Sequence, residues 1–300
     1  MPRLGIALIV VLSLAWGASW PMMKIAVGAV PPWTFRVLTT VLAGAVFLLA
    51  LRLTGISIRI PPRRLGWLVL SSLVNVTIWM MCSAFALTML PAGRSVIIAY
   101  SMPVWAVLLG AVFLGERIDR SRVMGLVLGL AGLAVLVGED LGDLTAAPLG
   151  ALLMTAGAVS WAAGTIILKR IDWGMTAVAF SGWQLLVGGV PVLACALLWE
   201  SGSLGPVGWR EVGALLYVFF IAVMIGNYAW IKIVSLMPAG VASIGTVAIP
   251  VVGVISGALV LGEAVGWREL VALILVVASL AAVLMRPVGG APRPRRRPLA

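Results

Sequence analysis

The chain contains one long stretch twice: Pro91–Glu116 reads PAGRSVIIAYSMPVWAVLLGAVFLGE, and Pro238–Glu263 reads PAGVASIGTVAIPVVGVISGALVLGE. Without a gap, 12 of the 26 aligned positions are identical. Each copy opens with Pro-Ala-Gly, carries a proline near its middle (Pro103 and Pro250) and closes with Gly-Glu. Two apolar stretches with prolines and glycines at the same positions predict that one unit was duplicated to give this chain.

The composition indicates the solvent in which these stretches fold. Of the 300 residues, 62% are hydrophobic and only 10% are charged, and the mean hydropathy is +1.16. These values are typical of a polytopic membrane protein, whose partner is the lipid bilayer. The net charge of +11 comes from basic residues between apolar runs and in a C-terminal tail, without the basic face of a nucleic-acid-binding protein. We therefore expect no nucleic acid, and Cys82 and Cys195 show no pattern for a metal or cofactor.

A transmembrane helix needs about 20 mostly apolar residues, and the sequence holds ten windows of that length. They cover residues 4–24, 33–52, 65–88, 92–114, 121–138, 149–169, 176–199, 211–235, 240–261 and 268–286. Connections with prolines, glycines or acidic residues separate them. The predicted fold is an all-α polytopic membrane protein with ten transmembrane helices.

The basic residues predict the orientation of these spans. Of the 21 lysines and arginines, 16 lie on the side of the N-terminus and 5 on the other, and cytoplasmic loops carry the excess. Both termini are therefore predicted to be cytoplasmic. Because each copy holds five spans, the second copy enters the membrane from the opposite face. The expected architecture is a 5+5 inverted-topology repeat of residues 1–138 and 148–286, followed by a disordered basic tail at 287–300.

Inverted repeats are typical of secondary transporters, which bind their substrate near the membrane midplane between the two halves. Pro103 and Pro250 lie about half-way along the fourth and ninth spans, where a proline removes a backbone donor and bends the helix. We expect these bends to line a path and to act in gating. Duplication alone also fits a membrane scaffold or assembly factor that transports nothing, and this alternative stays open.

Polar and aromatic side chains inside the spans are few, so each is a candidate for contact with a small molecule. Asn75 and Trp79 are four residues apart and share a helix face. The other candidates are Tyr100 and Ser101 in the fourth span, Trp161 in the sixth, Gln184 in the seventh, and Asn227 and Tyr228 in the eighth. Together they predict an aromatic-walled pocket with a few amide and hydroxyl groups that orient a ligand.

The charged residues indicate little chemistry inside the membrane. All ten carboxylates lie in loops or at span ends, and the chain has no histidine, whereas proton coupling usually needs such a group within the membrane. We expect no enzyme, and either a facilitator or a carrier coupled to an ion through backbone carbonyls. Glu116 and Glu263 are expected to form a salt bridge or to cap a neighbouring backbone. Arg36, at the outer end of the second span, and Arg94 are candidates to attract a carboxylate at the outward mouth, although we expect both to be solvated at the surface.

Small residues predict where the helices touch. Gly125 and Gly129, and again Gly253 and Gly257, have the G-x-x-x-G spacing that lets two backbones approach closely. Such contacts form within one chain as readily as between chains, so we expect a monomer or a weak homodimer.

The chain resembles the drug/metabolite transporter superfamily, EamA type, in its ten spans, its Trp16-Gly17 pair, Pro91-Ala92-Gly93 with Pro103, and the Gly-Glu pairs at 115–116 and 262–263. Within that superfamily it is most similar to the bacterial aromatic amino-acid exporter (YddG-like) branch. The resemblance implies an inner-membrane carrier that exports aromatic and other neutral amino acids, or toxic aromatic compounds, through a cavity between its halves. Another metabolite or a drug is the alternative substrate. Val241 and Val247 replace Arg94 and Tyr100 in the second copy, so an asymmetric site is expected.

Overall fold

The computed structural model describes residues 3–115, 120–140, 146–200, 206–229, 233 and 239–284. Within these ranges every regular element is helical, and none is a strand. The predicted all-α class is therefore confirmed. A helix suits a membrane because it satisfies its backbone N–H and C=O groups internally, where lipid offers them no partner.

The helical elements include three π-helical segments (η1, η3 and η4) and one short 3₁₀ turn (η2). The first part of the chain forms α1 (Arg3–Gly17), α2 (Ser19–Ala29), α3 (Pro32–Arg36), η1 (Val37–Val41), α4 (Leu42–Leu53), η2 (Pro62–Arg64), α5 (Leu65–Ser72), η3 (Leu73–Ile78), α6 (Trp79–Met89), α7 (Ala92–Ala99), α8 (Met102–Leu114) and α9 (Arg120–Asp140). The second part forms α10 (Ala146–Arg170), α11 (Ala177–Trp199), α12 (Trp209–Leu216), η4 (Tyr217–Ile225), α14 (Ala239–Leu261) and α15 (Trp267–Leu284). Residues 226–229 continue η4 as a helix.

Among the described residues, seven helical segments are long and apolar enough to cross a membrane. Two shorter apolar helices, Val123–Val135 and Ala248–Leu261, lie within the fifth and ninth predicted spans. The chain is thus a multi-pass membrane protein. The count of ten spans, their orientation and their division into two repeats stay predictions.

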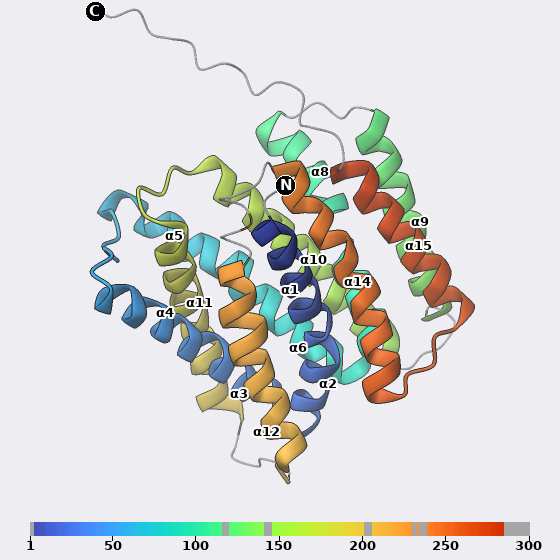
Figure 1. The fold of residues 1–300 in the computed structure, drawn as a ribbon, viewed down its shortest axis with the longest axis horizontal. Coiled ribbons are helices and arrows are strands. Elements are labelled where there is room, and N and C mark those ends of the chain that lie inside the picture. Colours follow the sequence, from blue (N-terminus) through green and yellow to red (C-terminus); the bar gives the residue numbers. More distant parts are fainter. Residues whose placement is uncertain are drawn as a thin grey trace, which may run out of the picture.

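The helices pack into one bundle in which segments far apart in the sequence are neighbours. Figure 1 shows α9 and α15 side by side at one edge of the bundle, and α4, α5 and α11 at the opposite edge. Between these edges, α1 packs against α14 and α6 against α10. The largest hydrophobic cluster accordingly joins buried side chains from both parts of the chain, such as Phe35, Tyr100, Met154 and Ile249.

The two mid-span prolines occupy different backbone positions. Pro103 is the second residue of α8, and Tyr100 and Ser101 separate α8 from α7. A proline is tolerated in the first turn of a helix because its missing N–H would have no intrahelical partner there. Pro250 instead lies inside α14, which continues through it. The fourth span is therefore interrupted while the ninth is continuous, and a gating role for either proline stays a prediction.

A carboxylate that follows α14 caps the start of α7. Glu263 accepts hydrogen bonds from the backbone N–H groups of Ala92 and Gly93, at 2.6 and 2.9 Å. Negative charge is favourable there because the first N–H groups of a helix lack partners and carry the positive end of its dipole. The backbone cap expected for Glu263 is thus confirmed, and Glu116 lies outside the described residues.

A second carboxylate makes the same kind of contact at the start of α3. Glu200, which follows α11, accepts hydrogen bonds from the backbone N–H groups of Trp33 and Thr34, at 2.8 and 2.7 Å. Arg94 pairs with Glu269, with 2.8 Å between Nη2 and Oε1, so the expectation that Arg94 is simply solvated was wrong. In all three contacts a charged group joins an early segment of the chain to a late one.

Candidate functional site

A cavity of about 180 Å³ lies inside the bundle, and its lining is mostly apolar. Residues of α1, α2, α3, η3, α6, α7, α8, α10, α11 and η4 form its wall together with Tyr100 and Asn227, so both parts of the chain contribute. A cavity of about 150 Å³ in another protein holds one benzene ring. The space here is therefore on the scale of one aromatic ring.

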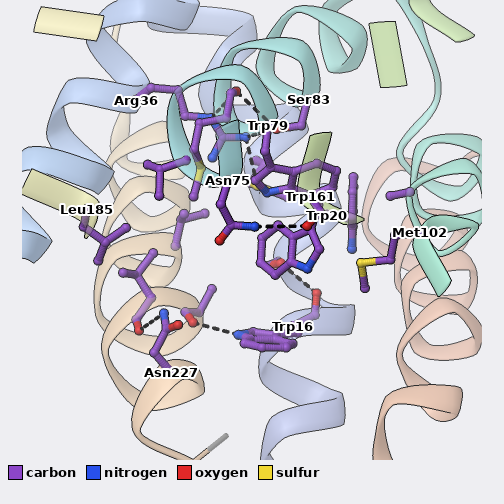
Figure 2. Close-up of a pocket in the computed structure, with 18 of the residues that line it drawn as sticks. Trp16, Trp20, Arg36, Asn75, Trp79, Ser83, Met102, Trp161, Leu185 and Asn227 are labelled. Carbon is purple, nitrogen blue, oxygen red and sulfur yellow. Dashed lines mark hydrogen bonds between the residues drawn. The ribbon is translucent and has the colours of Figure 1, made fainter. Parts of the chain in front are cut away.

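Most of the predicted contact residues line this cavity, namely Asn75, Trp79, Tyr100, Trp161, Gln184 and Asn227. Figure 2 shows Arg36 and Trp79 toward one end of the cavity and Trp16 and Asn227 toward the other, with Asn75 between them. These side chains come from segments far apart in the sequence, Trp16 near its start and Asn227 in its last third, and the bundle brings them together. Their contact with a substrate stays a prediction.

Two of the predicted residues do not line the cavity. The Ser101 side chain is buried, and its Oγ accepts a hydrogen bond from Trp105 Nε1 at 3.1 Å. Tyr228 points away from the bundle, with 56% of the residue exposed. Consecutive residues of a helix point about 100° apart, given 3.6 residues per turn, so Asn227 faces inward and its neighbour Tyr228 faces outward. We therefore leave both out of the proposed site.

Two tryptophans from different parts of the chain form one aromatic wall. Trp79, the first residue of α6, meets Trp161 of α10 edge to face, with ring centroids 5.1 Å apart and ring planes at 74°. This geometry places the positive edge of one ring against the negative face of the other. Because both rings also line the cavity, their mutual contact fixes the shape of that wall.

Trp16 lies at the other end of the cavity. Its Nε1 donates a hydrogen bond to the backbone carbonyl of Ala222 in η4, at 3.0 Å. Gly226 leaves the space for this indole, because a Cβ atom at that position would lie 2.3 Å from Trp16 Nε1. The indole is thus held by a polar contact on one edge while its ring borders the cavity.

Side-chain amides supply the neutral polar groups. Asn75 Nδ2 donates to the Trp161 carbonyl at 3.2 Å, and Asn227 Nδ2 donates to the Val223 carbonyl at 2.6 Å. Gly164 makes room for Asn75, since a Cβ atom there would lie 2.4 Å from Asn75 Cβ. In both asparagines the amide nitrogen is engaged, and within the described part of the chain Oδ1 accepts no hydrogen bond, which leaves it as an acceptor for a ligand.

Two π-helical segments contribute residues to the cavity wall, and a third begins next to a wall residue. The first, η1, directly follows Arg36; η3 contains Asn75 and Val76; and η4 contains Ala222 and Val223. Such wide turns are rare in helices and often lie at functional sites. Here the wide turns of η3 and η4 change which side chains of two spans face the cavity, a feature that helical periodicity alone could not predict.

Arg36 is the main correction to the expected site. It is buried, with 4% of the residue exposed, and it lines the cavity instead of lying in solvent at the outer mouth. Its Nε donates to the Met80 carbonyl at 2.9 Å, and its Nη2 donates to Ser83 Oγ at 2.7 Å. Its guanidinium carbon also lies 4.8 Å from the centroid of the Phe35 ring. The site therefore contains a cation, whereas the sequence predicts a solvated one at the surface.

The sequence also carries signals for three cavity residues that are absent from the predicted site, Trp16, Trp20 and Arg36. Trp16 and Trp20 are four residues apart, so they share a helix face, and both line the cavity. Arg36 is three residues inside the predicted second span, and the buried Thr39 and Thr40 follow it. A charged residue within an apolar window, followed by two further polar residues, is typical of a functional position in a membrane protein.

These features define a class of protein. An all-helical, multi-pass membrane bundle with a ring-sized, mostly apolar cavity that also presents amide and guanidinium groups offers a place for a small molecule. The chain belongs to the EamA-like transporter family, whose model matches residues 3–138 and 148–285. The expected superfamily and the expectation that the chain is not an enzyme are both confirmed by this membership. Its partners are therefore small-molecule substrates.

Several relatives cover nearly the whole chain. YvbV of Bacillus subtilis strain 168, an uncharacterized transporter, is 28% identical over 94% of this chain and 92% of its own. A probable amino-acid metabolite efflux pump of Escherichia coli K12 is 25% identical over 92% of both chains. The aromatic amino acid exporter YddG of Ancylobacter novellus is 32% identical over 63% of this chain and 66% of its own. A solved crystal structure matches 93% of this chain and 95% of its own, with a TM-score of 0.66 at 24% identity, and so shares the fold.

Proposed function

We propose that this chain exports aromatic and other neutral amino acids across the bacterial inner membrane by alternating access, with both termini in the cytoplasm. The observation that carries the proposal is the ring-sized cavity bordered by Trp16, Trp79 and Trp161. An aromatic side chain gains favourable contact with indole surfaces. The Oδ1 atoms of Asn75 and Asn227, two residues of the cavity wall, can orient the polar end of an amino acid.

The direction and the substrate class are supported by the names of relatives. One relative is named as a probable amino-acid metabolite efflux pump and another as an aromatic amino acid exporter. The cavity agrees with the second name, because its aromatic wall suits a flat ring. Its mostly apolar lining also suits another metabolite or an aromatic drug, and export of such a compound is the second candidate function.

The placement of charged groups supports a facilitator. The chain has no histidine, and the carboxylates whose side chains are described lie at helix ends or in connections, namely Asp172, Glu200, Glu211, Glu263 and Glu269. A proton-coupled carrier usually holds its titratable group inside the membrane. We therefore propose that the substrate moves down its own gradient without proton coupling.

A ligand screen by thermal unfolding tests the proposed substrate class. A compound that binds only the folded protein stabilises it by about 2.7 kcal/mol at a concentration 100 times its Kd. We expect L-phenylalanine and L-tryptophan to raise the unfolding midpoint of the purified protein in detergent, and L-lysine and L-glutamate at equal concentration to leave it unchanged. Stabilisation by a drug or another metabolite, with no response to phenylalanine or tryptophan, would favour the second candidate.

A further inference from the structure

Arg36 brings a full positive charge to a place where the described part of the chain provides only neutral partners. Its recorded contacts are the Met80 carbonyl, the Ser83 hydroxyl, the sulfur atom of Met23 and the Phe35 ring. A buried charge costs several kcal/mol of desolvation unless an opposite charge and good hydrogen bonds compensate it. The neutral partners supply hydrogen bonds and leave the charge uncompensated.

The carboxylates whose side chains are described all have partners other than Arg36. Glu200 and Glu263 cap the starts of α3 and α7, and Glu269 pairs with Arg94. The Glu211 carboxylate accepts a hydrogen bond from the Gly208 N–H, and that of Asp172 accepts one from the Gly174 N–H. Among the residues whose side chains are placed, none provides a negative charge to Arg36.

The guanidinium also keeps free donors. Within the described ranges, hydrogen bonds engage Nε and Nη2, and the Nη1 amino group has no protein partner. Arg36 is itself part of the cavity wall, and Figure 2 shows it at one end of the space whose centre holds Asn75 and Trp161. A carboxylate oxygen is the partner that best matches a planar guanidinium with unused N–H groups.

We infer that Arg36 binds the carboxylate of the substrate, so that the cavity selects small molecules with an aromatic ring and a free carboxylate. The inference rests on the proposed function and names the group by which that site recognises its ligand. The cavity residues offer an ammonium group only neutral oxygens, such as Oδ1 of Asn75 and of Asn227. The carboxylate therefore contributes more to binding than the ammonium does, and the ring lies along the indoles of Trp79 and Trp161.

Three compounds separate these contributions on the unmodified protein: L-phenylalanine, 3-phenylpropanoate, which lacks the amino group, and 2-phenylethylamine, which lacks the carboxylate. Their dissociation constants are measured by titration calorimetry on the full chain in detergent. We expect phenylpropanoate to bind within a few-fold of phenylalanine and phenylethylamine to bind roughly ten- to hundred-fold more weakly, since hydrogen bonds to charged groups are the strong ones. Phenylethylamine that binds as tightly as phenylalanine would overturn the inference.

Variants of Arg36 test whether this residue causes the difference in affinity between compounds with and without a carboxylate. Arg36→Gln is expected to weaken phenylalanine and phenylpropanoate by roughly ten- to hundred-fold and to leave phenylethylamine unchanged, whereas Arg36→Lys keeps the charge and gives an intermediate loss. Arg52, exposed at the end of α4, supplies the matched control, and Arg52→Gln should change none of the three constants. A folded Arg36→Gln protein with full affinity for phenylpropanoate would contradict the assignment.

The outcomes distinguish this inference from the proposed function. Aromatic carboxylates that bind through Arg36, together with an absence of phenylalanine transport, would retain the inference and reject the amino-acid carrier. Phenylalanine transport that is unaffected in a folded Arg36→Gln protein would retain the amino-acid carrier and reject the role of Arg36. If Arg36→Gln does not fold, the three compounds on the unmodified protein decide the matter alone.

Discussion

Trp161 is the residue on which several features of the cavity converge. Its ring packs edge to face on Trp79, and its backbone carbonyl accepts hydrogen bonds from Asn75 Nδ2 and from Thr165 Oγ1. The carbonyl contacts survive any change of side chain, whereas the ring contact does not. Substitution of the ring therefore removes a wall of the cavity and leaves the neighbouring asparagine in place.

We expect Trp161→Ala to weaken phenylalanine binding and slow its transport while the unfolding midpoint changes little, because part of this indole faces the cavity. Trp173 is the matched control: it is buried, its ring centroid lies 4.2 Å from that of Phe180, and it does not line the cavity. Trp173→Ala should cost about 3–5 kcal/mol of stability, as large buried aromatics do, without a change in phenylalanine affinity. Equal loss of stability in both variants would show that Trp161 mainly packs.

Sequence reasoning found individual site residues where polarity is rare. Asn75, Gln184 and Asn227 stood out because an amide inside an apolar window needs a reason to be there. Arg36 did not, because its nearness to the end of a span suggested solvent, and only tertiary packing buries it beneath Met80 and Ser83. Burial of a side chain near a span end depends on the helices around it, which one sequence does not reveal.

At the scale of elements, the helices of early and late segments are joined by carboxylate caps. The cap of α7 by Glu263 could be anticipated from the Gly-Glu ending of the repeated stretch, although its partner could not. The interruption between α7 and α8 agrees with a proline at that place, whereas Pro250 leaves α14 continuous. A proline at the same position of the repeated stretch therefore starts a helix in one copy and lies within a helix in the other. The packing of the surrounding helices decides between these two backbone conformations.

We expect Glu263→Gln to lower the free energy of unfolding by about 1 kcal/mol, because the substitution removes the charge that stabilises the start of α7. Glu211 gives the comparison, since it caps its own helix through the Gly208 N–H at the surface. Glu211→Gln should change stability by no more than about 0.5 kcal/mol. Chemical or thermal unfolding in detergent measures both, and losses of equal size would argue against a structural role for the cap of α7.

The π-helical segments were beyond prediction from this chain. The residues of η1, η3 and η4 are ordinary apolar and polar residues of a membrane helix. A π turn is set by the contacts that stabilise it, here including the Trp16 bond to the Ala222 carbonyl in η4. Periodicity could therefore locate the spans but not the way in which η3 and η4 turn side chains toward the cavity.

At the scale of the whole molecule, composition and hydropathy predicted the helical membrane bundle, and the family match and the structure confirm it. The repeat further predicts two inverted halves, an arrangement that would let the cavity open alternately to each side of the membrane. Membrane orientation depends on the lipid environment and on charges in the loops, which the packing of helices does not record. The inverted halves and the cytoplasmic termini therefore stay predictions.

Counterflow in proteoliposomes tests the central claim most directly. Vesicles that contain the full chain and excess unlabelled phenylalanine are diluted into a trace of labelled phenylalanine, with and without an imposed pH gradient. The account predicts transient uptake of labelled phenylalanine above that of protein-free vesicles. The peak ratio of internal to external label should be the same with and without the pH gradient, because substrate exchange alone drives the uptake. Absence of uptake with folded protein would contradict an amino-acid carrier, and uptake that requires the pH gradient would contradict a facilitator.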